Sequence, residues 1–162
     1  MERSFREGPI EGVLVHPLKR FADDRGWLME LFRIDDLPTE FSPVMGYVSE
    51  TLAGVRRGPH EHLDQADLFA FLGPGEFHIE LWDNRPSSPT FNNHRALIAG
   101  ASQPTRLIVP AGVVHGYRNI SPLPALVYNF PNRLYRGPGR TEPVDEVRHE
   151  HDPSSPFQMQ GP

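Results

Sequence analysis

Proline and glycine limit what this chain can fold into more than any other feature of its sequence. The 162 residues include 18 prolines and 14 glycines, and few stretches between them suit a helix of ordinary length, because proline ends helices and interior glycine destabilises them. The apolar runs between these residues have the length of strands: 12–15, 26–32, 68–72, 77–82, 106–109 and 125–128. Short strands separated by turns predict an all-β sandwich or barrel.

Local patterns refine this prediction. In the run from Phe77 to Asp83, apolar residues at 77, 79 and 81 alternate with His78, Glu80 and Trp82, which predicts a half-buried strand. We expect only one short helix, in residues 34–41. Residues 136–162 are polar and predict either a surface extension or a loosely ordered tail of a single domain that spans 1–162.

The composition excludes several classes of protein. With 38% hydrophobic and 23% charged residues, the chain can bury a core. The net charge is -5 and no basic stripe recurs, which argues against a nucleic-acid partner. Without cysteine it has no disulfides and no thiolate metal ligands. No apolar run reaches membrane-spanning length, and no apolar export segment stands near the start. We therefore expect a cytoplasmic protein that does not bind membranes.

Two histidine-containing segments carry the chemistry. The first runs from Gly54 to Asp67 and contains His60 and His62, which point the same way if they lie on a strand. The second is a Pro-x-Gly turn at 110–112 followed by His115. Together these segments resemble the two motifs of the cupin superfamily, with Asp67 where a Glu is usual. The resemblance implies a cupin jelly roll.

A narrower resemblance extends from about residue 10 to 135. Five blocks fall in the order and near the spacing of dTDP-4-dehydrorhamnose 3,5-epimerases: 21–32, 57–60, 83–91, 109–117 and 126–128. The resemblance implies an isomerase that acts on a nucleotide-linked 4-keto-6-deoxy sugar, needs no cofactor and forms a homodimer. The stretch before Gly12 is available for exchange between the subunits of such a dimer.

The same resemblance assigns roles to single residues. It makes His60 the base that removes a proton beside the keto group, Tyr128 the acid on the opposite face, and Arg57 the cation near the enolate oxygen. It also implies two groups around the substrate: Arg25, Trp27 and Glu30 at the nucleotide, and His115 paired with Asp83 behind the site.

Three departures from that family stand out. Asp67 occupies the place of a usual Lys, Met45 and Tyr47 replace a Gln and an Asn, and the C-terminal Ser-x-Lys-Asp segment with its acid is missing. A second imidazole and an aspartate suit a divalent metal such as Zn, Mn, Fe or Ni. The alternative metal ligands are His60, His62, Asp67 and His115.

Other interpretations stay open at this level. The chain could be a metal-dependent cupin dioxygenase, lyase or isomerase acting on a small carbonyl compound, or a non-catalytic sugar-binding cupin. Single residues also have ordinary structural explanations. His115 suits a core histidine, Tyr128 suits packing in an apolar strand, Asp83 suits a turn with Arg85, and Arg25 with Glu30 suits a surface salt bridge.

Overall fold

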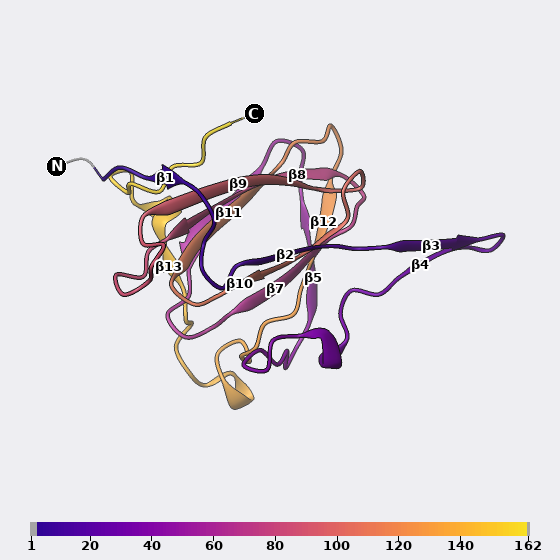
Figure 1. Ribbon diagram of the computed structural model, residues 1–162, viewed down its shortest axis with the longest axis horizontal. Helices are drawn as coiled ribbons and strands as arrows, with labels where there is room; N and C mark the ends of the chain where they lie inside the picture. Colours follow the sequence, from indigo (N-terminus) through magenta and orange to yellow (C-terminus); the bar gives the residue numbers. More distant parts are fainter. Residues whose placement is uncertain (1–2, 162) are drawn as a thin grey trace.

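The computed structural model describes residues 3–161, which form two facing, mainly antiparallel sheets closed into a jelly-roll barrel (Figure 1). The six-stranded sheet has the order β1 (Arg6–Glu7), β9 (Asn93–Gly100), β8 (Glu76–Asp83), β11 (Val113–Asn119), β6 (Arg56–Glu61), β13 (Val147–Arg148). The five-stranded sheet has the order β2 (Leu14–Pro17), β10 (Thr105–Val109), β7 (Asp67–Phe71), β12 (Ala125–Asn129), β5 (Tyr47–Thr51). The all-β jelly-roll prediction is confirmed.

Helical structure in the described chain is limited to three single 3-10 turns: η1 (Ile34–Asp36), η2 (Pro138–Arg140) and η3 (His149–His151). The predicted helix over 34–41 is therefore wrong beyond its first turn. Leu37 is extended, with φ -97° and ψ 154°, as expected for a residue that precedes a proline, because the ring of Pro38 disfavours the helical conformation there.

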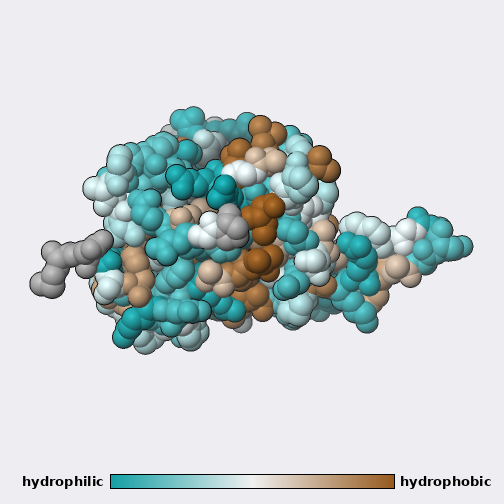
Figure 2. All heavy atoms as spheres, turned by 90° about the horizontal axis from the view of Figure 1, so that it is seen from above, coloured by the Kyte–Doolittle hydropathy of each residue, from teal (hydrophilic) through white to brown (hydrophobic). Residues whose placement is uncertain are grey.

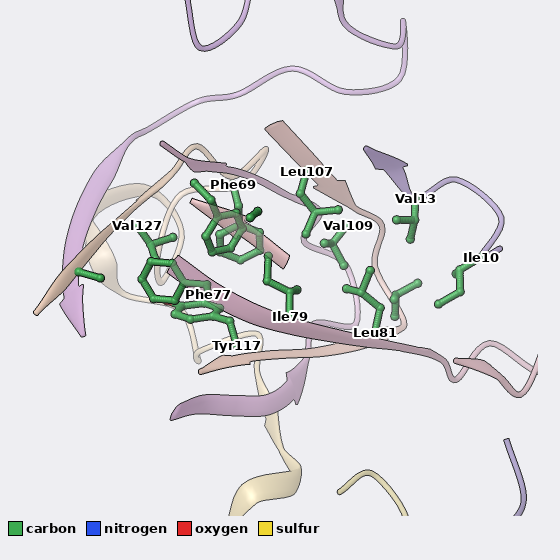
Figure 3. Close-up of a cluster of buried hydrophobic side chains, with 14 residues drawn as sticks. Ile10, Val13, Phe69, Phe77, Ile79, Leu81, Leu107, Val109, Tyr117 and Val127 are labelled. Carbon is green, nitrogen blue, oxygen red and sulfur yellow. The ribbon is translucent and has the colours of Figure 1, made fainter. Parts of the chain in front are cut away.

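Aromatic and aliphatic side chains from both sheets fill the barrel (Figure 3). The ring of Tyr117 meets those of Phe69, Phe71 and Phe77 edge-on, with centroids 5.5–6.1 Å apart. Phe77, Ile79 and Leu81 all belong to this core, so the predicted inner face of β8 is confirmed. Burying each such side chain contributes roughly 1.5–3 kcal/mol.

The outer face of β8 is buried as well, against the prediction of a half-buried strand. Glu80 and Trp82 are only 1% and 2% exposed. Trp82 packs against Phe5 near the N-terminus and Phe157 near the C-terminus. The two terminal segments therefore cover this side of the six-stranded sheet.

The C-terminal extension is part of the fold, and the expectation of a loosely ordered tail is wrong. β13 pairs with β6 through Val147–Glu61 and Arg148–His60, and Phe157 is almost fully buried. The N-terminal stretch is also engaged, because β1 pairs in parallel with β9 of its own chain. Exchange of this stretch between the subunits of a dimer stays a prediction. Within residues 3–161 no helix has the length and apolarity needed to cross a bilayer.

A third element, the β3–β4 hairpin, projects from the barrel (Figure 1). Its strands, β3 (Arg20–Asp23) and β4 (Gly26–Met29), pair only with each other. Figure 2 shows the same projection from a second direction, with hydrophilic residues at its tip. Apolar side chains farther back are exposed, including Trp27 and Leu28.

Candidate active site

A cavity of about 680 Å³ opens at the end of the barrel where β5, β6, β11 and β12 meet the C-terminal segment. Its volume lies within the usual range for small-molecule sites, about 300–1,000 Å³. His60, His62, Arg57, Tyr47 and Tyr117 all line it. The two histidine-containing segments are separate in sequence and meet here, because β6 and β11 are neighbouring strands.

A bulge in β6 explains how Arg57 and His60 reach the same cavity. Residues three apart on a regular strand face opposite sides, yet His60 pairs with His115, and Arg57 pairs with Tyr117. The extra residue lies at Gly58 and Pro59, and such a bulge changes which side the chain faces. Gly58 has φ +77°, and a Cβ there would lie 2.6 Å from the carbonyl oxygen of His115. Only glycine permits this close approach.

Three imidazoles converge inside the cavity. The ring centroids of His60 and His62 lie 5.5 Å apart, as predicted for two residues on one face of a strand. His115 adds the third ring, 4.5 Å from His60 and 5.9 Å from His62. One ligand atom from each histidine lies within 4.8 Å of the other two, so the sequence-predicted histidines do come together.

Asp67 faces this cluster from the other sheet. Its Oδ2 lies 3.1 Å from Nε2 of His62 and 3.7 Å from Nε2 of His115. Its Oδ1 accepts hydrogen bonds from the amides of Gln65 and Asn129, at 3.0 and 2.9 Å. The carboxylate is 1% exposed, so it is buried with partners on both oxygens.

Burial and neighbouring charges give the three imidazoles different pKa values. Burial lowers the pKa of His60 to about 2, with further lowering from His115 and His62. Burial also lowers the pKa of His115, against the pull of Asp67. Burial would lower the pKa of His62 too, but the hydrogen bond and charge of Asp67 and the contact with Asp145 raise it to about 9. In the unliganded cavity, His62 is therefore the charged histidine.

The C-terminal segment contributes four acids to the cavity lining, of which Asp145 and Glu146 contact the histidine segment. The side chain of Asp145 accepts hydrogen bonds from the backbone N–H groups of residues 63, 64 and 65, at 2.8–2.9 Å, and its carbonyl oxygen accepts one from Nδ1 of His62. Oε1 of Glu146 lies 3.9 Å from Nε2 of His60. An acid beside His60 is therefore present, although the Ser-x-Lys-Asp segment is not.

Tyr128 does not reach the cavity. Along β12 the side chains of Ala125 and Val127 enter the core, and Asn129 points inward to Asp67. Tyr128 lies between them on the opposite, outer face. Three other tyrosines line the cavity, Tyr47, Tyr117 and Tyr135, and Oη of Tyr47 accepts a 2.7 Å hydrogen bond from Nδ2 of Asn129. Burial and the charge of Asp67 raise the pKa of Tyr47 to about 12, so its hydroxyl stays protonated.

The residues expected at the nucleotide lie elsewhere in this chain. Arg25 and Trp27 are on the projecting hairpin, Glu30 directly follows it, and none of the three lines the cavity. Arg25 pairs with Asp23, and Trp27 lies under the guanidinium of Arg20.

Asp83 does not pair with His115. Its carboxylate binds Arg85, Ser88 and Thr90 at 2.6–2.9 Å, while Nδ1 of His115 donates to the carbonyl oxygen of Val113. Asp83 instead closes the turn after β8, so the predicted pair behind the site is wrong.

Side chains of both charges line the cavity, and its acids are Asp64, Glu142, Asp145, Glu146 and Glu150. Five arginines border it: Arg56, Arg57, Arg133, Arg136 and Arg148. Arg57 donates to Oγ1 of Thr51 and to the carbonyl oxygen of Glu50. Arg133 and Arg136 also donate to backbone carbonyls. Apart from Arg148, no arginine of this group has a carboxylate within salt-bridge distance among residues 3–161. Their charges remain available to an anion.

Comparison with known proteins identifies the family. The model of the dTDP-4-dehydrorhamnose 3,5-epimerase family matches residues 7–142. The chain belongs to this family. A probable low-salt glycan biosynthesis epimerase of Haloferax volcanii, Agl13, is 35% identical over 144 residues, covering 88% of this chain and 89% of that protein. The spore coat polysaccharide biosynthesis protein SpsL of Bacillus subtilis is 33% identical, covering 78% and 82%.

A solved structure supports the same assignment. A dTDP sugar isomerase from Desulfovibrio desulfuricans superposes with a TM-score of 0.78 at 26% identity, covering 92% of this chain and 91% of that one. These relatives confirm the resemblance, the cupin jelly roll and the isomerase class, and the chain is a nucleotide-sugar epimerase-like protein. They do not support the alternative of a metal-dependent dioxygenase or lyase.

Sequence reasoning missed four residues that shape the cavity: Gln65, Asn129, Asp145 and Glu146. The segment Val144-Asp145-Glu146-Val147 carried a usable signal, because it is an acidic pair between apolar residues inside an otherwise polar extension. For Asn129 the signal was the alternation along 125–129, which places the asparagine on the same face as Val127.

Proposed function

We propose that this cavity binds a nucleotide-linked 4-keto-6-deoxy sugar and epimerises it at a carbon next to the ketone. The proton on that carbon moves to His60, the electron pair passes to the keto oxygen as an enolate, and a proton returns from the other side. The reaction is an isomerisation and consumes no oxidant or reductant.

The observation that carries the proposal is the position of the Glu146 carboxylate, 3.9 Å from Nε2 of His60, inside a cavity that five arginines border. Burial lowers the pKa of His60, so the imidazole is unprotonated at neutral pH but is by itself a weak base. Glu146 supplies negative charge beside Nε2 and stabilises the imidazolium as it forms. This acid also weakens the case for a non-catalytic sugar-binding cupin, which rested on its absence from the sequence pattern.

The arginines suit the nucleotide part of such a substrate. A diphosphate needs guanidinium groups that no internal carboxylate occupies, and Arg57, Arg133 and Arg136 meet this condition among the described residues. Arg57, opposite Tyr117 on the inner face, is also placed to steady an enolate oxygen.

Tyr47 is the proposed proton donor in place of Tyr128. Its hydroxyl oxygen already accepts from Asn129, so its own hydrogen is free for the substrate. Tyr47 and His60 come from β5 and β6, which belong to the two facing sheets. Proton removal and return from different sides of the substrate give inversion at the carbon.

The test is solvent exchange with a dTDP-linked 4-keto-6-deoxy sugar in D₂O, followed by mass spectrometry and NMR. Wild-type protein should incorporate deuterium next to the ketone and form the epimer. Replacing the base (His60→Asn) should slow incorporation about 10²- to 10⁴-fold, the usual contribution of a general base. The Tyr47→Phe variant should still incorporate deuterium through His60 but form little epimer, and Glu40→Ala, at an exposed glutamate, is the matched surface control.

Absence of incorporation with several such substrates would overturn the proposal. So would a His60→Asn protein that exchanges at the wild-type rate. Equal loss of incorporation and epimer formation in Tyr47→Phe would remove Tyr47 as the donor while leaving the base in place.

The proposal includes a cytoplasmic homodimer, in which the projecting hairpin meets a second copy. Trp27 and Leu28 expose 51% and 61% of their surface on this hairpin, and such exposed apolar groups favour an interface. Since Arg25 does not reach the cavity of its own chain, contact with a nucleotide requires the cavity of a partner. Sedimentation of wild-type protein and of Trp27→Ala with Leu28→Ser tests this, with a monomeric wild-type protein as the contrary result.

A further inference from the structure

Three side chains of the five-stranded sheet lie in a row across neighbouring strands beside the cavity. Tyr47 on β5 and Asn129 on β12 are directly opposite each other in the register, so their side chains lie on the same face, with Cβ atoms roughly 5 Å apart. Asp67 on β7, the next strand, is two residues before Phe69, the other partner of Asn129. Because side chains alternate along a strand, Asp67 shares that face as well. The register therefore brings a phenol, an amide and a carboxylate together.

The amide of Asn129 is bonded to both neighbours through a single atom. Its Nδ2 lies 2.9 Å from Oδ1 of Asp67 and 2.7 Å from Oη of Tyr47. The ionised carboxylate can only accept hydrogen bonds, so the nitrogen of the amide must be on this side. Each of its two N–H groups then has one acceptor, and Oη of Tyr47 is one of the two. The phenol hydrogen makes no hydrogen bond among the described residues, so it is left for the cavity that Tyr47 lines.

The other end of the same amide is unsatisfied. Oδ1 of Asn129 is buried and has no hydrogen-bond partner among residues 3–161. A buried acceptor without a donor lowers stability, and the preceding inward positions of β12 hold Ala125 and Val127, which carry no such group. Packing alone therefore does not account for an asparagine at this position, whereas its hydrogen bond to Tyr47 gives it a chemical role.

We propose that Asn129, held by Asp67, is a positioning residue for Tyr47 and sets the direction in which this tyrosine gives up its proton. The inference rests on the proposed function, in which Tyr47 returns a proton to the enolate. As the C–H bond forms, the O–H bond of Tyr47 breaks, and the N–H of Asn129 stabilises the phenolate oxygen that results. The tyrosinate then takes a proton from water and His60 releases one, so no other reactant is needed. Asp67, which occupies the place of a usual Lys, thus acts on the reaction through Asn129.

The experiment measures the two halves of the reaction separately in Asn129→Leu, which keeps the approximate size of the side chain and removes both N–H groups. With a dTDP-linked 4-keto-6-deoxy sugar in D₂O, deuterium incorporation should stay near the wild-type rate, because the base, His60, is unchanged. Epimer formation should fall about ten- to a hundred-fold, the usual effect of losing a hydrogen bond to a charged group. Asn129→Ala should give the same fall, so the result does not depend on how the leucine packs.

The matched control is Gln65→Leu. Gln65 donates to the same Oδ1 of Asp67 at 3.0 Å but makes no hydrogen bond to Tyr47. This variant should therefore keep the wild-type ratio of epimer formed to deuterium incorporated. Folding of each variant is checked by circular dichroism.

NMR follows the Tyr47 hydroxyl without substrate. Protein labelled with ¹³C at Cζ of tyrosine gives one signal for each of its four tyrosines, and Tyr47→Phe identifies the signal of Tyr47. Asn129→Leu should shift that signal, because the hydroxyl loses its hydrogen-bond donor. The signal of Tyr128, on the outer face, should stay where it is.

The outcomes separate this inference from the proposed function. No deuterium incorporation by wild-type protein would overturn the proposed function, and the inference with it. In a wild-type protein that does incorporate deuterium, an unchanged ratio in Asn129→Leu, or an equal loss of incorporation and epimer, would overturn the inference alone. A shifted Tyr47 signal together with an unchanged ratio would overturn it too, because the contact would then be structural only. So would a Gln65→Leu protein whose ratio falls as far as that of Asn129→Leu.

Discussion

Histidines meet carboxylates in two parts of this molecule, with opposite results. On the outer face of the six-stranded sheet, Glu80 accepts from Nε2 of His94 at 2.8 Å and from the backbone N–H of Gln160. Close by, Glu61 accepts from Nε2 of His149 and the amide of Asn84, at 2.9 and 2.8 Å. Each of these four hydrogen bonds joins residues at least 14 positions apart in the chain.

Inside the barrel, one carboxylate lies beside two histidines, and a ring nitrogen of one of them has no hydrogen-bond partner among the described residues. Asp67 faces both His62 and His115, and Nε2 of His115 has no partner in the described chain. Histidine–carboxylate contacts therefore hold the C-terminal segment on the outer face of the sheet. In the cavity, the same kind of contact leaves one histidine nitrogen without a hydrogen bond. Paired groups contribute stability, whereas an unsatisfied buried group marks a place where a ligand can bind.

The largest effect should follow from opening an outer pair. Replacing Glu80, which is 1% exposed, with Ala leaves Nε2 of His94 and the N–H of Gln160 without their acceptor, and each such loss costs about 1–3 kcal/mol. Urea denaturation measures the loss. Deuterium exchange per folded molecule should remain at the wild-type level, because Glu80 does not line the cavity.

The exposed Glu40→Ala variant serves as the control and should change the free energy of unfolding by less than about 0.5 kcal/mol. A Glu80→Ala protein as stable as this control would break the comparison, because the outer contacts would then not fasten the terminal segments.

The apolar packing of the C-terminal segment on the outer face should contribute nearly as much to the free energy of unfolding as the hydrogen bonds of Glu80. Phe157 is 3% exposed and packs on Phe5, Trp82 and His149, with centroids 4.6–6.1 Å apart. Phe157→Ala removes this packing and should cost about 3 kcal/mol, the lower end for buried phenylalanine. Denaturation should measure this loss of stability, and proteolysis after residue 152 should become faster. If stability and proteolysis are both unchanged, the Phe157 ring does not hold the C-terminal segment in place.

The Asp83 carboxylate is fully hydrogen-bonded, and its contribution to the free energy of unfolding depends on pH. Burial would raise its pKa, but hydrogen bonds from Arg85, Ser88 and Thr90 lower it from 3.8 to about 2. A lowered folded-state pKa means that this stability is fully present above about pH 4 and is lost as the pH falls towards 2. The expected contribution is about 1–2 kcal/mol.

Denaturation of wild type and Asp83→Asn across pH 2–6 measures this difference. The two stability curves should converge at the acid end of that range. A gap between them that stays constant with pH would show that the aspartate acts through shape rather than through charge.

The sequence predicted the barrel and the histidine cluster well, for a physical reason. Strand length, alternation and the spacing of His60 and His62 are local properties, and a regular strand converts them directly into geometry. The places of Glu146 and Asp145 in the cavity could not be predicted in this way. They depend on a polar segment that comes back to the His60–His62 strand about 80 residues later in the chain. The use of Glu80 likewise depends on terminal segments whose packing no local pattern reveals.

Strand register determines whether the residues assigned from the family resemblance face the cavity or the outer surface. A one-residue difference in how β12 aligns moves a side chain from the cavity to the outer face, which is what separates Tyr128 from Asn129. The bulge at Gly58 has the opposite effect, because it brings Arg57 to the face of His60. Neither can be read from the matching blocks alone.

The smallest effect should come from Tyr128, and it tests the inside–outside comparison at the level of one hydroxyl group. Tyr128→Phe removes an oxygen on the outer face of β12, for which we expect a stability change within about 0.5 kcal/mol. Incorporation of deuterium and formation of the epimer should both stay at the wild-type rate, whereas Tyr47→Phe loses the epimer. If Tyr128→Phe instead abolished epimer formation, the register of β12 in the active protein would differ by one residue, and Asn129 would leave Asp67. The two tyrosine variants measured side by side in one exchange assay therefore decide which face of β12 meets the substrate.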